Sequence, residues 1–505
     1  MVQKRYTGKV GFTHLFLCLF VFLAINSMAQ NTPIDQPDII DAHNNILKLK
    51  IKKGRETLNS ITPNDKSLGH YYYVKNLADV VELLLNEDTE LYKSYDDRED
   101  DYLKEIKKMN DDDPFKLFYT AEIKLLWALV KIQYGDELNG GMNLRSSWNS
   151  IQKNISAFPE FNANNKTLGL LHIVFGSMPD NYQWILKLLG IKGNIPKGIE
   201  ELNMITEMSP FWLETAIIKS VVSVNILNTP KESLAFIEEL LSQNQDNIII
   251  TYLYNTTLIK YSKSQEALSN LTKLLYLNNE YLFLNLVYYQ IGEIYLQKHD
   301  YTRARLFYSK FLNDHKGQNF IKDAWFKTAI TYWLQNNEKL AEVHVEKAND
   351  SGRTFVSADK NANGILDEDQ LPNKELMKIR LATDGGYFEE AERIFSTLNE
   401  NMFETKKEKS VYYYRQARLK HKLGEEDKAI YFYLYTIKKA GNENWYYAPF
   451  SCLNTGYIYM DKGEMEKAKF YFNKTLSYKK HKYKTGIDVK AEAAINTIAK
   501  MESTK

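Results

Sequence analysis

The feature that most constrains this chain is a repeated helical pattern in its second half. In one copy, Tyr288, Gly292 and Tyr295 recur at intervals of three or four residues, which places them on one face of a helix. Ala304 and Tyr308 share a face of a second helix, and Ala304 follows Gly292 by twelve positions. Small residues at this spacing let two antiparallel helices approach closely, and aromatic rings fill the space beside them. The pattern therefore predicts pairs of packed helices.

The same pattern recurs four more times, at spacings of 37 to 50 residues. This arrangement resembles that of tetratricopeptide repeats, whose helix pairs stack because a single pair cannot bury its apolar face. We therefore expect an all-α fold, a right-handed superhelical solenoid of antiparallel helix pairs. The further copies contain Trp325, Ala329, Tyr332, Ala341 and Ala348; Gly386, Ala391 and Phe395; Tyr413, Ala417, Gly424, Ala429 and Tyr433; and Gly456, Tyr459, Gly463, Ala468 and Phe472, with weaker copies centred on Ala235 and Ala267.

The first 29 residues have the pattern of an export signal. Basic residues precede an apolar stretch, and small residues lead up to a cleavage site expected after Ala29. The alternatives are an uncleaved anchor, for which the stretch is short, and a lipid on Cys18, whose neighbour Leu17 is bulky for a lipidation signal. After cleavage Cys452 is the one remaining cysteine, so no intramolecular disulfide can form. We therefore expect an exported protein of the bacterial periplasm or cell surface.

Charge and motifs exclude several classes of function. The chain has a formal charge of +1, and removal of the three basic residues of the leader leaves 1 − 3 = −2. A nearly neutral protein is a poor general binder of nucleic acid. No later stretch is apolar over the length of a membrane span, so we expect no stable membrane insertion after cleavage. The histidines are scattered and no nucleophile, metalloprotease or phosphate-binding motif occurs, so we expect no enzymatic activity.

The first half is predicted to be helical but poorly repetitive, with Gly140-Gly141 and Phe158-Pro159 interrupting the helices. Adjacent tyrosines such as Tyr446-Tyr447 are expected to pack between repeats, with stacking on a peptide or glycan as the alternative. The predicted regions are a signal peptide over 1–29, an N-terminal helical region over 30–135, a helical region with Gly and Pro breaks over 136–215, repeats over 216–350, an inserted Asp- and Asn-rich loop over 351–371, and repeats with a C-terminal helix over 372–505.

A more specific resemblance covers much of residues 135–500. Gly140-Gly141 with Phe158 and Phe161, the segment 185–193, and the terminal Tyr447-Ala448-Pro449 are similar to elements of the tetratricopeptide-39 proteins, which are related to yeast inclusion-body clearance factors. The resemblance implies a helical solenoid without catalytic residues. Known members act inside cells, whereas this chain has an export leader, so only the fold is carried over.

The inserted loop resembles an EF-hand calcium loop. Oxygen-bearing residues stand at loop positions 1, 3, 5 and 9, and Gly364 stands at position 6, where the sharp turn requires glycine. The bidentate Glu of position 12 is replaced by Gln370, so any calcium affinity should be weak, with a dissociation constant of about 10⁻⁴ to 10⁻³ M. The alternative is an ordinary Asx-rich linker. The candidate ligands are Asp359, Asn361 and Asn363 through their side chains, Ile365 through its carbonyl, and Asp367 either directly or through a water molecule.

These observations favour a binding protein over an enzyme. Our main hypothesis is an exported solenoid that binds a protein or peptide partner in its concave groove, stabilised by calcium if the loop binds it. The alternative is a surface glycan-binding protein of nutrient uptake, built on a fold that contains tetratricopeptide repeats.

Overall fold

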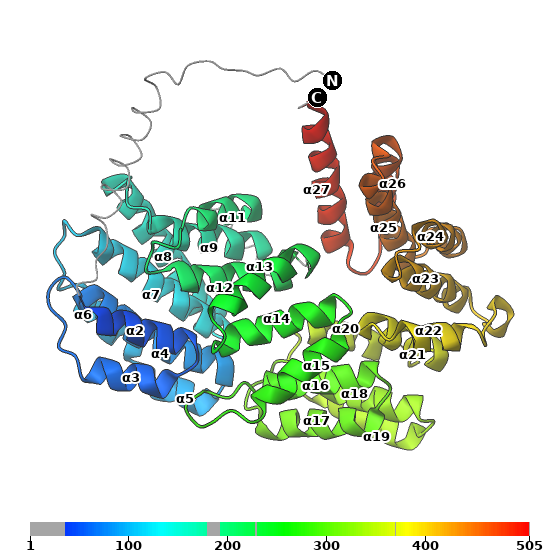
Figure 1. Ribbon diagram of the computed structural model, residues 1–505, viewed down its shortest axis with the longest axis horizontal. Coiled ribbons are helices and arrows are strands. Elements are labelled where there is room, and N and C mark those ends of the chain that lie inside the picture. Colours follow the sequence, from blue (N-terminus) through cyan, green and yellow to red (C-terminus); the bar gives the residue numbers. More distant parts are fainter. Residues whose placement is uncertain (1–35, 179–191, 228–229, 369, 504–505) are drawn as a thin grey trace, which may run out of the picture. The chain divides into compact units, whose positions relative to one another are not determined.

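The computed structural model describes residues 36–178, 192–227, 230–368 and 370–503. Throughout these ranges the regular secondary structure is helical, which confirms the predicted all-α class (Figure 1). The predicted signal peptide over 1–29, with Cys18, and residues 185–191 of the family resemblance lie outside the described residues. None of the described helices is long and apolar enough to cross a membrane.

The chain forms two compact units. The first contains the described residues up to Tyr254 together with Tyr276–Leu284 and His315–Gly317. Its helices are α2 (Pro37–Leu47), α3 (Ile51–Asn59), α4 (Leu68–Asn86), α5 (Thr89–Ser94), α6 (Arg98–Ile106), α7 (Pro114–Gln133), α8 (Glu137–Ala157), α9 (Asn164–Ser177), α11 (Ile195–Asn203), α12 (Trp212–Val222), the π-helix η3 (Ser223–Leu227) and α13 (Pro230–Gln243), followed by the first part of α14 (Ile248–Lys260).

A glycine allows the close approach of the longest helix pair of the first unit, α7 and α8. Gly140 and Gly141 lie inside α8, so the prediction that they interrupt a helix is wrong. A Cβ atom on Gly140 would lie 2.6 Å from Cγ1 of Ile132 on α7, closer than side-chain carbons approach. The glycine is therefore needed for the close contact between α7 and α8 rather than for a turn. The predicted break at Phe158 is confirmed, since α8 ends at Ala157.

The second unit contains five helix pairs, in the positions of the five predicted repeats. They are α16 (Leu286–Gln297) with α17 (Tyr301–Asp314), α18 (Ile321–Leu334) with α19 (Glu338–Asp350), α21 (Lys374–Gly385) with α22 (Phe388–Phe395), α23 (Lys406–Lys422) with α24 (Glu426–Ala440), and α25 (Tyr447–Asp461) with α26 (Met465–Ser477). The unit also contains the end of α14, α15 (Ser264–Leu274), α20 (Ser357–Leu366), the 3₁₀-helix η4 (Glu400–Met402) and α27 (Lys484–Ser503).

The predicted small and aromatic residues form the contacts within these pairs. A Cβ atom on Gly292 would lie 2.9 Å from the Tyr308 ring, and one on Gly456 would lie 2.5 Å from the Phe472 ring. Both rings are completely buried. Gly463 has a φ of 76°, in the left-handed region that favours glycine, and forms the predicted turn between α25 and α26.

The first helices of successive pairs also contact one another. α16 packs against α18 and α21, α21 against α23, α23 against α25, and α25 against α27. These helices form one layer of the second unit, and the second helices of the pairs, such as α24 and α26, lie beside them (Figure 1). We call the side of the layer that carries Arg380, Arg418 and Lys490 the first-helix face.

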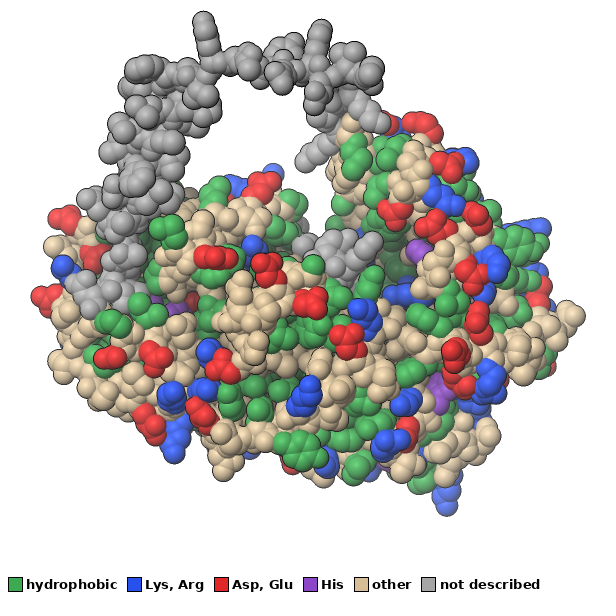
Figure 2. All heavy atoms as spheres, viewed as in Figure 1, with side chains coloured by type: hydrophobic (Ala, Val, Ile, Leu, Met, Phe, Trp, Pro, Cys, Tyr) green, Lys and Arg blue, Asp and Glu red, His purple; other side chains and the backbone are tan. Residues whose placement is uncertain are grey.

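The charged surface on the face seen in Figure 2 is mixed in sign. Over the face seen in Figure 2, Lys and Arg side chains are interspersed with Asp and Glu side chains. This agrees with the small net charge of the sequence.

Candidate functional site

The predicted calcium loop is largely helical in this structure. Residues Ser357–Leu366 form α20, which packs against α18. The Asp359 carboxylate is buried and accepts hydrogen bonds from the backbone N–H groups of Phe320, at 2.7 Å, and Asp323, at 2.9 Å. Burial, which these hydrogen bonds only partly offset, raises the pKa of Asp359 to about 6. This carboxylate is therefore used as a partner for backbone amides that precede or begin α18.

The other candidate ligands do not converge with Asp359. Asn361 is exposed, and Asn363 Nδ2 donates to Asp367 Oδ2 at 2.9 Å. The Ile365 carbonyl accepts from the N–H of Glu368 at 3.0 Å. Among the residues that the structure describes, no group of three His, Cys, Asp or Glu side chains is arranged to hold a metal ion. An EF-hand-type loop would need a different backbone conformation here, and calcium binding stays a prediction.

A lysine ammonium contacts oxygens near the end of α20. Lys482, which precedes α27, donates from Nζ to the Gly364 carbonyl at 2.7 Å and lies 2.9 Å from a carboxylate oxygen of Glu368. Lys407 of α23 contacts the other oxygen of Glu368 at 2.6 Å. The end of α20 is thus attached to α23 through Lys407 and, through Lys482, to the end of the terminal repeat, more than 100 positions away.

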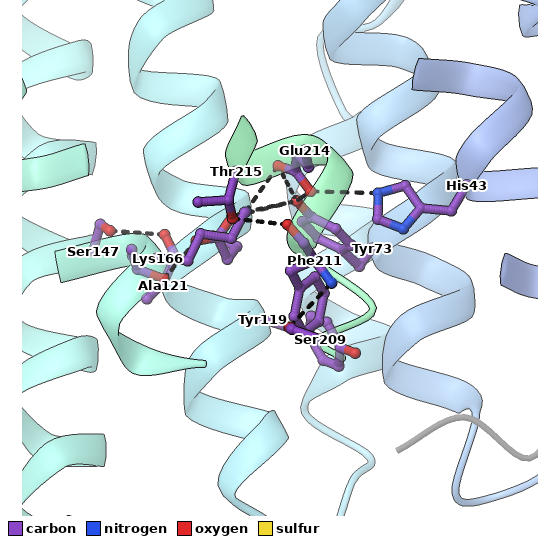
Figure 3. Close-up of polar contacts among 12 residues, drawn as sticks. His43, Tyr73, Tyr119, Ala121, Ser147, Lys166, Ser209, Phe211, Glu214 and Thr215 are labelled. Carbon is purple, nitrogen blue, oxygen red and sulfur yellow. Dashed lines mark hydrogen bonds and ion pairs between the residues drawn. The ribbon is translucent and has the colours of Figure 1, made fainter. Parts of the chain in front are cut away.

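The first unit contains a buried ionic cluster that sequence reasoning missed (Figure 3). Lys166, at the start of α9, is completely buried; its ammonium forms a short ion pair with Glu122 of α7 and lies 2.8 Å from Glu214 of α12. The Tyr73 hydroxyl of α4 donates to Glu214 at 2.7 Å, and His43 Nε2 of α2 lies 3.3 Å from the same carboxylate. Five helices therefore meet at this cluster.

Buried aromatic side chains surround the cluster. His70, Tyr119 and Phe211 pack around Tyr73 and are almost completely buried. Burial, together with the neighbouring His43, lowers the pKa of His70 well below its ordinary value. Burial alone would raise the pKa of Glu214, but the Lys166 charge and the polar contacts of His43 and Lys166 outweigh it and lower the pKa. The ion pairs are therefore formed at neutral pH.

The cluster has the residue types of a catalytic site but no access for a substrate. The side chains of Lys166 and Glu122 are 1% exposed, and those of Glu214 and His43 are 7% and 2% exposed. Removing one partner of such a pair leaves an uncompensated buried charge, which is costly. We interpret the cluster as the polar centre that fixes how α2, α4, α7, α9 and α12 pack.

The first-helix face of the second unit carries an excess of basic side chains. Arg380 of α21 and Arg418 of α23 contact the same carboxylate of Asp384, at 3.6 and 3.4 Å. Lys422 of α23 and Lys490 of α27 are half-buried, and no ion pair of either is found among the described residues. We define the basic face as Lys260, Arg380, Arg415, Arg418, Lys422 and Lys490, together with Asp384, whose carboxylate contacts Arg380 and Arg418.

The charges of these cations lower the pKa values of neighbouring lysines. Burial and the nearby charge of Arg418 lower the pKa of both Lys422 and Lys490. The Lys260 side chain is exposed as a whole, but protein atoms around its ammonium exclude part of the surrounding water. This desolvation and the charge of Lys490 lower the pKa of Lys260 to about 8. Groups from α14, α23 and α27 therefore face one another. Like charges that influence one another in this way favour a bound anion.

Tyrosines lie beside the basic face. Tyr446 and Tyr447 have ring centroids 4.4 Å apart, and Tyr447 also contacts the ring of Tyr414 at 5.4 Å. The Arg415 guanidinium lies 5.3 Å from the Tyr414 ring centroid. The rings pack on one another and on the guanidinium, as the simpler of the two sequence interpretations predicts.

Nearby carboxylates are already paired with lysines outside the basic face. Glu293 of α16 forms an ion pair with Lys327, and Glu368 is held by Lys407 and Lys482. No local sequence pattern indicates the basic face, because its members are separated by up to 230 positions, from Lys260 to Lys490. The helix layer brings them together.

Comparison with a known family identifies two of the helix pairs. The tetratricopeptide repeat family model matches residues 287–313, which cover most of α16 and α17, and residues 451–481, which cover most of α25 and α26. These two segments match tetratricopeptide repeats. The two matched segments are the first and last of the five helix pairs, and each of the three pairs between them has a buried alanine of the predicted pattern, Ala329, Ala391 or Ala417. No curated protein matches the chain in sequence.

Several solved structures are similar over most of the chain, at low identity. An IFIT1 monomeric mutant with m7Gppp-AAAA shares 16% identity at a TM-score of 0.31, over 88% of this chain and 95% of that one. The apo quorum sensor NprR from B. thuringiensis shares 12% identity at 0.29, over 88% and 97%. The Cut9-Hcn1 hetero-tetramer of the APC/C shares 12% identity at 0.31, over 89% and 95%. TM-scores of this size say nothing about what this chain binds.

Proposed function

We propose that this protein is a non-enzymatic scaffold that binds a protein or peptide partner through the first-helix face of its second unit. The observation that carries the proposal is the basic face itself, in which Arg380 and Arg418 share one carboxylate, while Lys422 and Lys490 form no ion pair with the described residues. Side chains needed only for folding are normally paired or turned to solvent, whereas cations crowded at one face have an unmet need for a counter-charge.

A matched pair of exposed tyrosines tests this proposal. Tyr483 is 52% exposed and packs on Tyr446 beside the basic face, whereas Tyr431 is 53% exposed on the second helix α24. The tagged full chain, isolated with its partners from its own cells, is compared with the variants Tyr483→Ser and Tyr431→Ser. We expect the partner to be lost from Tyr483→Ser and retained by Tyr431→Ser. Equal capture by both variants would contradict the location of the site.

Export and calcium binding are further parts of the proposal. The pattern of residues 1–29 supports export to the periplasm or the cell surface, and mass spectrometry of the mature protein is expected to find Gln30 at its N-terminus. Calcium binding by Asp359, Asn361, Asn363, Ile365 and Asp367 rests on their spacing. In the conformation described above, α20 would have to unwind before these oxygens surround an ion.

Glycan binding is the second candidate function, and one cavity favours it. A cavity of about 350 Å³ in the first unit is lined by Trp212, the amides of Asn44, Gln243 and Asn244, and the charged Glu207 and Lys48. An aromatic face with amides around it suits a sugar ring, which offers C–H groups on one side and hydroxyls at its edge. A glycan array read with the wild type and Trp212→Ala tests this function, because a glycan bound by both would not lie in this cavity.

A further inference from the structure

The charge of the basic face narrows the class of partner that the second unit accepts. Lys422 Nζ lies 5.8 Å from the ring centroid of Tyr261, and the Lys490 backbone carbonyl accepts from the Tyr457 hydroxyl at 3.4 Å. Both residues are thus held in place through ring or backbone contacts. Asp384 is shared between Arg380 and Arg418, at 3.6 and 3.4 Å, and so compensates neither fully.

We infer that the basic face binds an acidic, extended polypeptide segment, whose carboxylates pair with Arg418, Lys422 and Lys490. The inference rests on the proposed function, since it names the class of partner for the same face. A carboxylate between these groups would supply the counter-charge that Asp384 alone does not, and arginine can bind it through two parallel hydrogen bonds.

The spacing of the cations suits a polypeptide. Arg380, Arg418 and Lys490 lie on α21, α23 and α27, which belong to one helix layer. Neighbouring packed helices are about 8–10 Å apart, and an extended chain advances about 3.3–3.6 Å per residue. An acidic residue at roughly every third position therefore advances by one helix of the layer, with α25 as the intermediate step between α23 and α27.

The tyrosines favour a peptide over nucleic acid or a polysaccharide. Bases and sugar rings bind aromatic side chains by stacking on an open ring face. Here Tyr446 packs on Tyr447 at 4.4 Å and on Tyr483 at 5.3 Å, and Arg415 covers Tyr414. The rings beside the basic face are thus engaged with one another. The net charge of the chain is also too small for general attraction of a polyanion.

The test uses a defined peptide and the full-length protein. The probe is a fluorescein-labelled 15-residue peptide with Glu at every third position and Ser or Gly between, and its control has Gln in place of Glu. We expect fluorescence anisotropy to show binding of the Glu peptide alone. Raising the salt concentration from 0.05 to 0.3 M should weaken this binding several-fold, because the ionic contacts are partly exposed.

Two double variants with the same change in net charge locate the binding. Lys422→Gln/Lys490→Gln removes two cations of the basic face, and Lys339→Gln/Lys438→Gln removes two exposed lysines of the second helices α19 and α24. We expect at least tenfold weaker peptide binding for the first variant and less than twofold for the second. Circular dichroism melting of both variants checks that they fold as the wild type does.

The other outcomes contradict the inference. Equal binding of the Gln peptide, equal affinity of both double variants, or tighter binding of a 15-nucleotide oligothymidylate or of a uronic-acid polysaccharide would each exclude an acidic peptide as the ligand class. If the Tyr483→Ser experiment locates a native partner on this face while the Glu peptide fails to bind, the proposed function is supported. The inference that the partner is an acidic peptide is then refuted.

Discussion

The ammonium of Lys166 lies 2.8 Å from a carboxylate oxygen of Glu214, although 48 residues separate the two in the chain, and both side chains are almost completely buried. Replacing Lys166 with Met would leave Glu122 and Glu214 buried side by side without a cation. We therefore expect Lys166→Met to destabilise the first unit by about 3–5 kcal/mol. Hydrogen exchange should rise in peptides from α7 and α9, with peptides from α23 as the internal control. Unchanged exchange in α9 would refute the role we give the cluster.

The glycine at the centre of the last repeat offers a second test. A Cβ atom on Gly456 would lie 2.5 Å from the Phe472 ring, which is completely buried and cannot move aside freely. We expect Gly456→Ala to cost about 1–3 kcal/mol by overpacking. The matched control is Gly486→Ala in α27, where a Cβ atom would meet nothing within 4 Å. That change should stabilise the helix by up to about 1 kcal/mol. Thermal unfolding of both variants measures the two effects, and equal shifts would contradict the predicted contact.

His421 makes the stability of the second unit depend on pH. His421 of α23 faces the hydroxyl of Tyr433 at 3.1 Å, and burial, with the charges of Arg418 and Lys422, lowers its pKa to about 4. In the unfolded chain its pKa is about 6.5, so the unfolded state takes up the proton first as pH falls. The group therefore contributes stability above pH 6.5 that is lost as pH falls towards 4.

We expect this loss to amount to about 1–2 kcal/mol between pH 7 and pH 5. Urea unfolding of the wild type and of His421→Gln at both values of pH measures it. The variant should lose less stability on acidification than the wild type. If the two lose the same amount, the histidine is not the group that titrates.

Local contacts explain why the repeats could be predicted from the sequence. Gly292 meets Tyr308, 16 positions later, and Gly456 meets Phe472, also 16 positions later, so one helix pair contains both partners. The pattern of small and aromatic residues is therefore readable within a window of about one repeat. The family model matches the first and last of these pairs.

Contacts between distant segments explain what the sequence did not indicate. Tyr73 donates to Glu214 across 141 positions, and no periodicity links two such residues. Asp359 shows that a local pattern can also be present while distant contacts determine what the side chain does. Its neighbours fit the spacing of a calcium loop, but its carboxylate accepts from backbone N–H groups at Phe320 and Asp323, which a loop pattern cannot reveal.

The attachment of α20 to the terminal repeat leads to a last prediction, on calcium. Lys482 places a positive charge 2.7 Å from the Gly364 carbonyl and 2.9 Å from Glu368, among the oxygens that a bound calcium ion would approach. If the segment binds calcium, Lys482→Gln should bind it more tightly than the wild type, because a repelling charge is removed. Lys480→Gln, which removes an exposed lysine two positions away, should not.

Isothermal titration with calcium chloride, in the wild type, the two lysine variants and Asp359→Asn, measures this effect. Wild-type binding in the range of about 10⁻⁴ to 10⁻³ M, tightened in Lys482→Gln and lost in Asp359→Asn, would show that the segment leaves its helical conformation to hold the ion. Equal heats in all four proteins would mean that calcium binds elsewhere or not at all. In that case the Lys482 ammonium occupies the position that a calcium ion would take, and the oxygens of this segment serve to attach α20 to the terminal repeat.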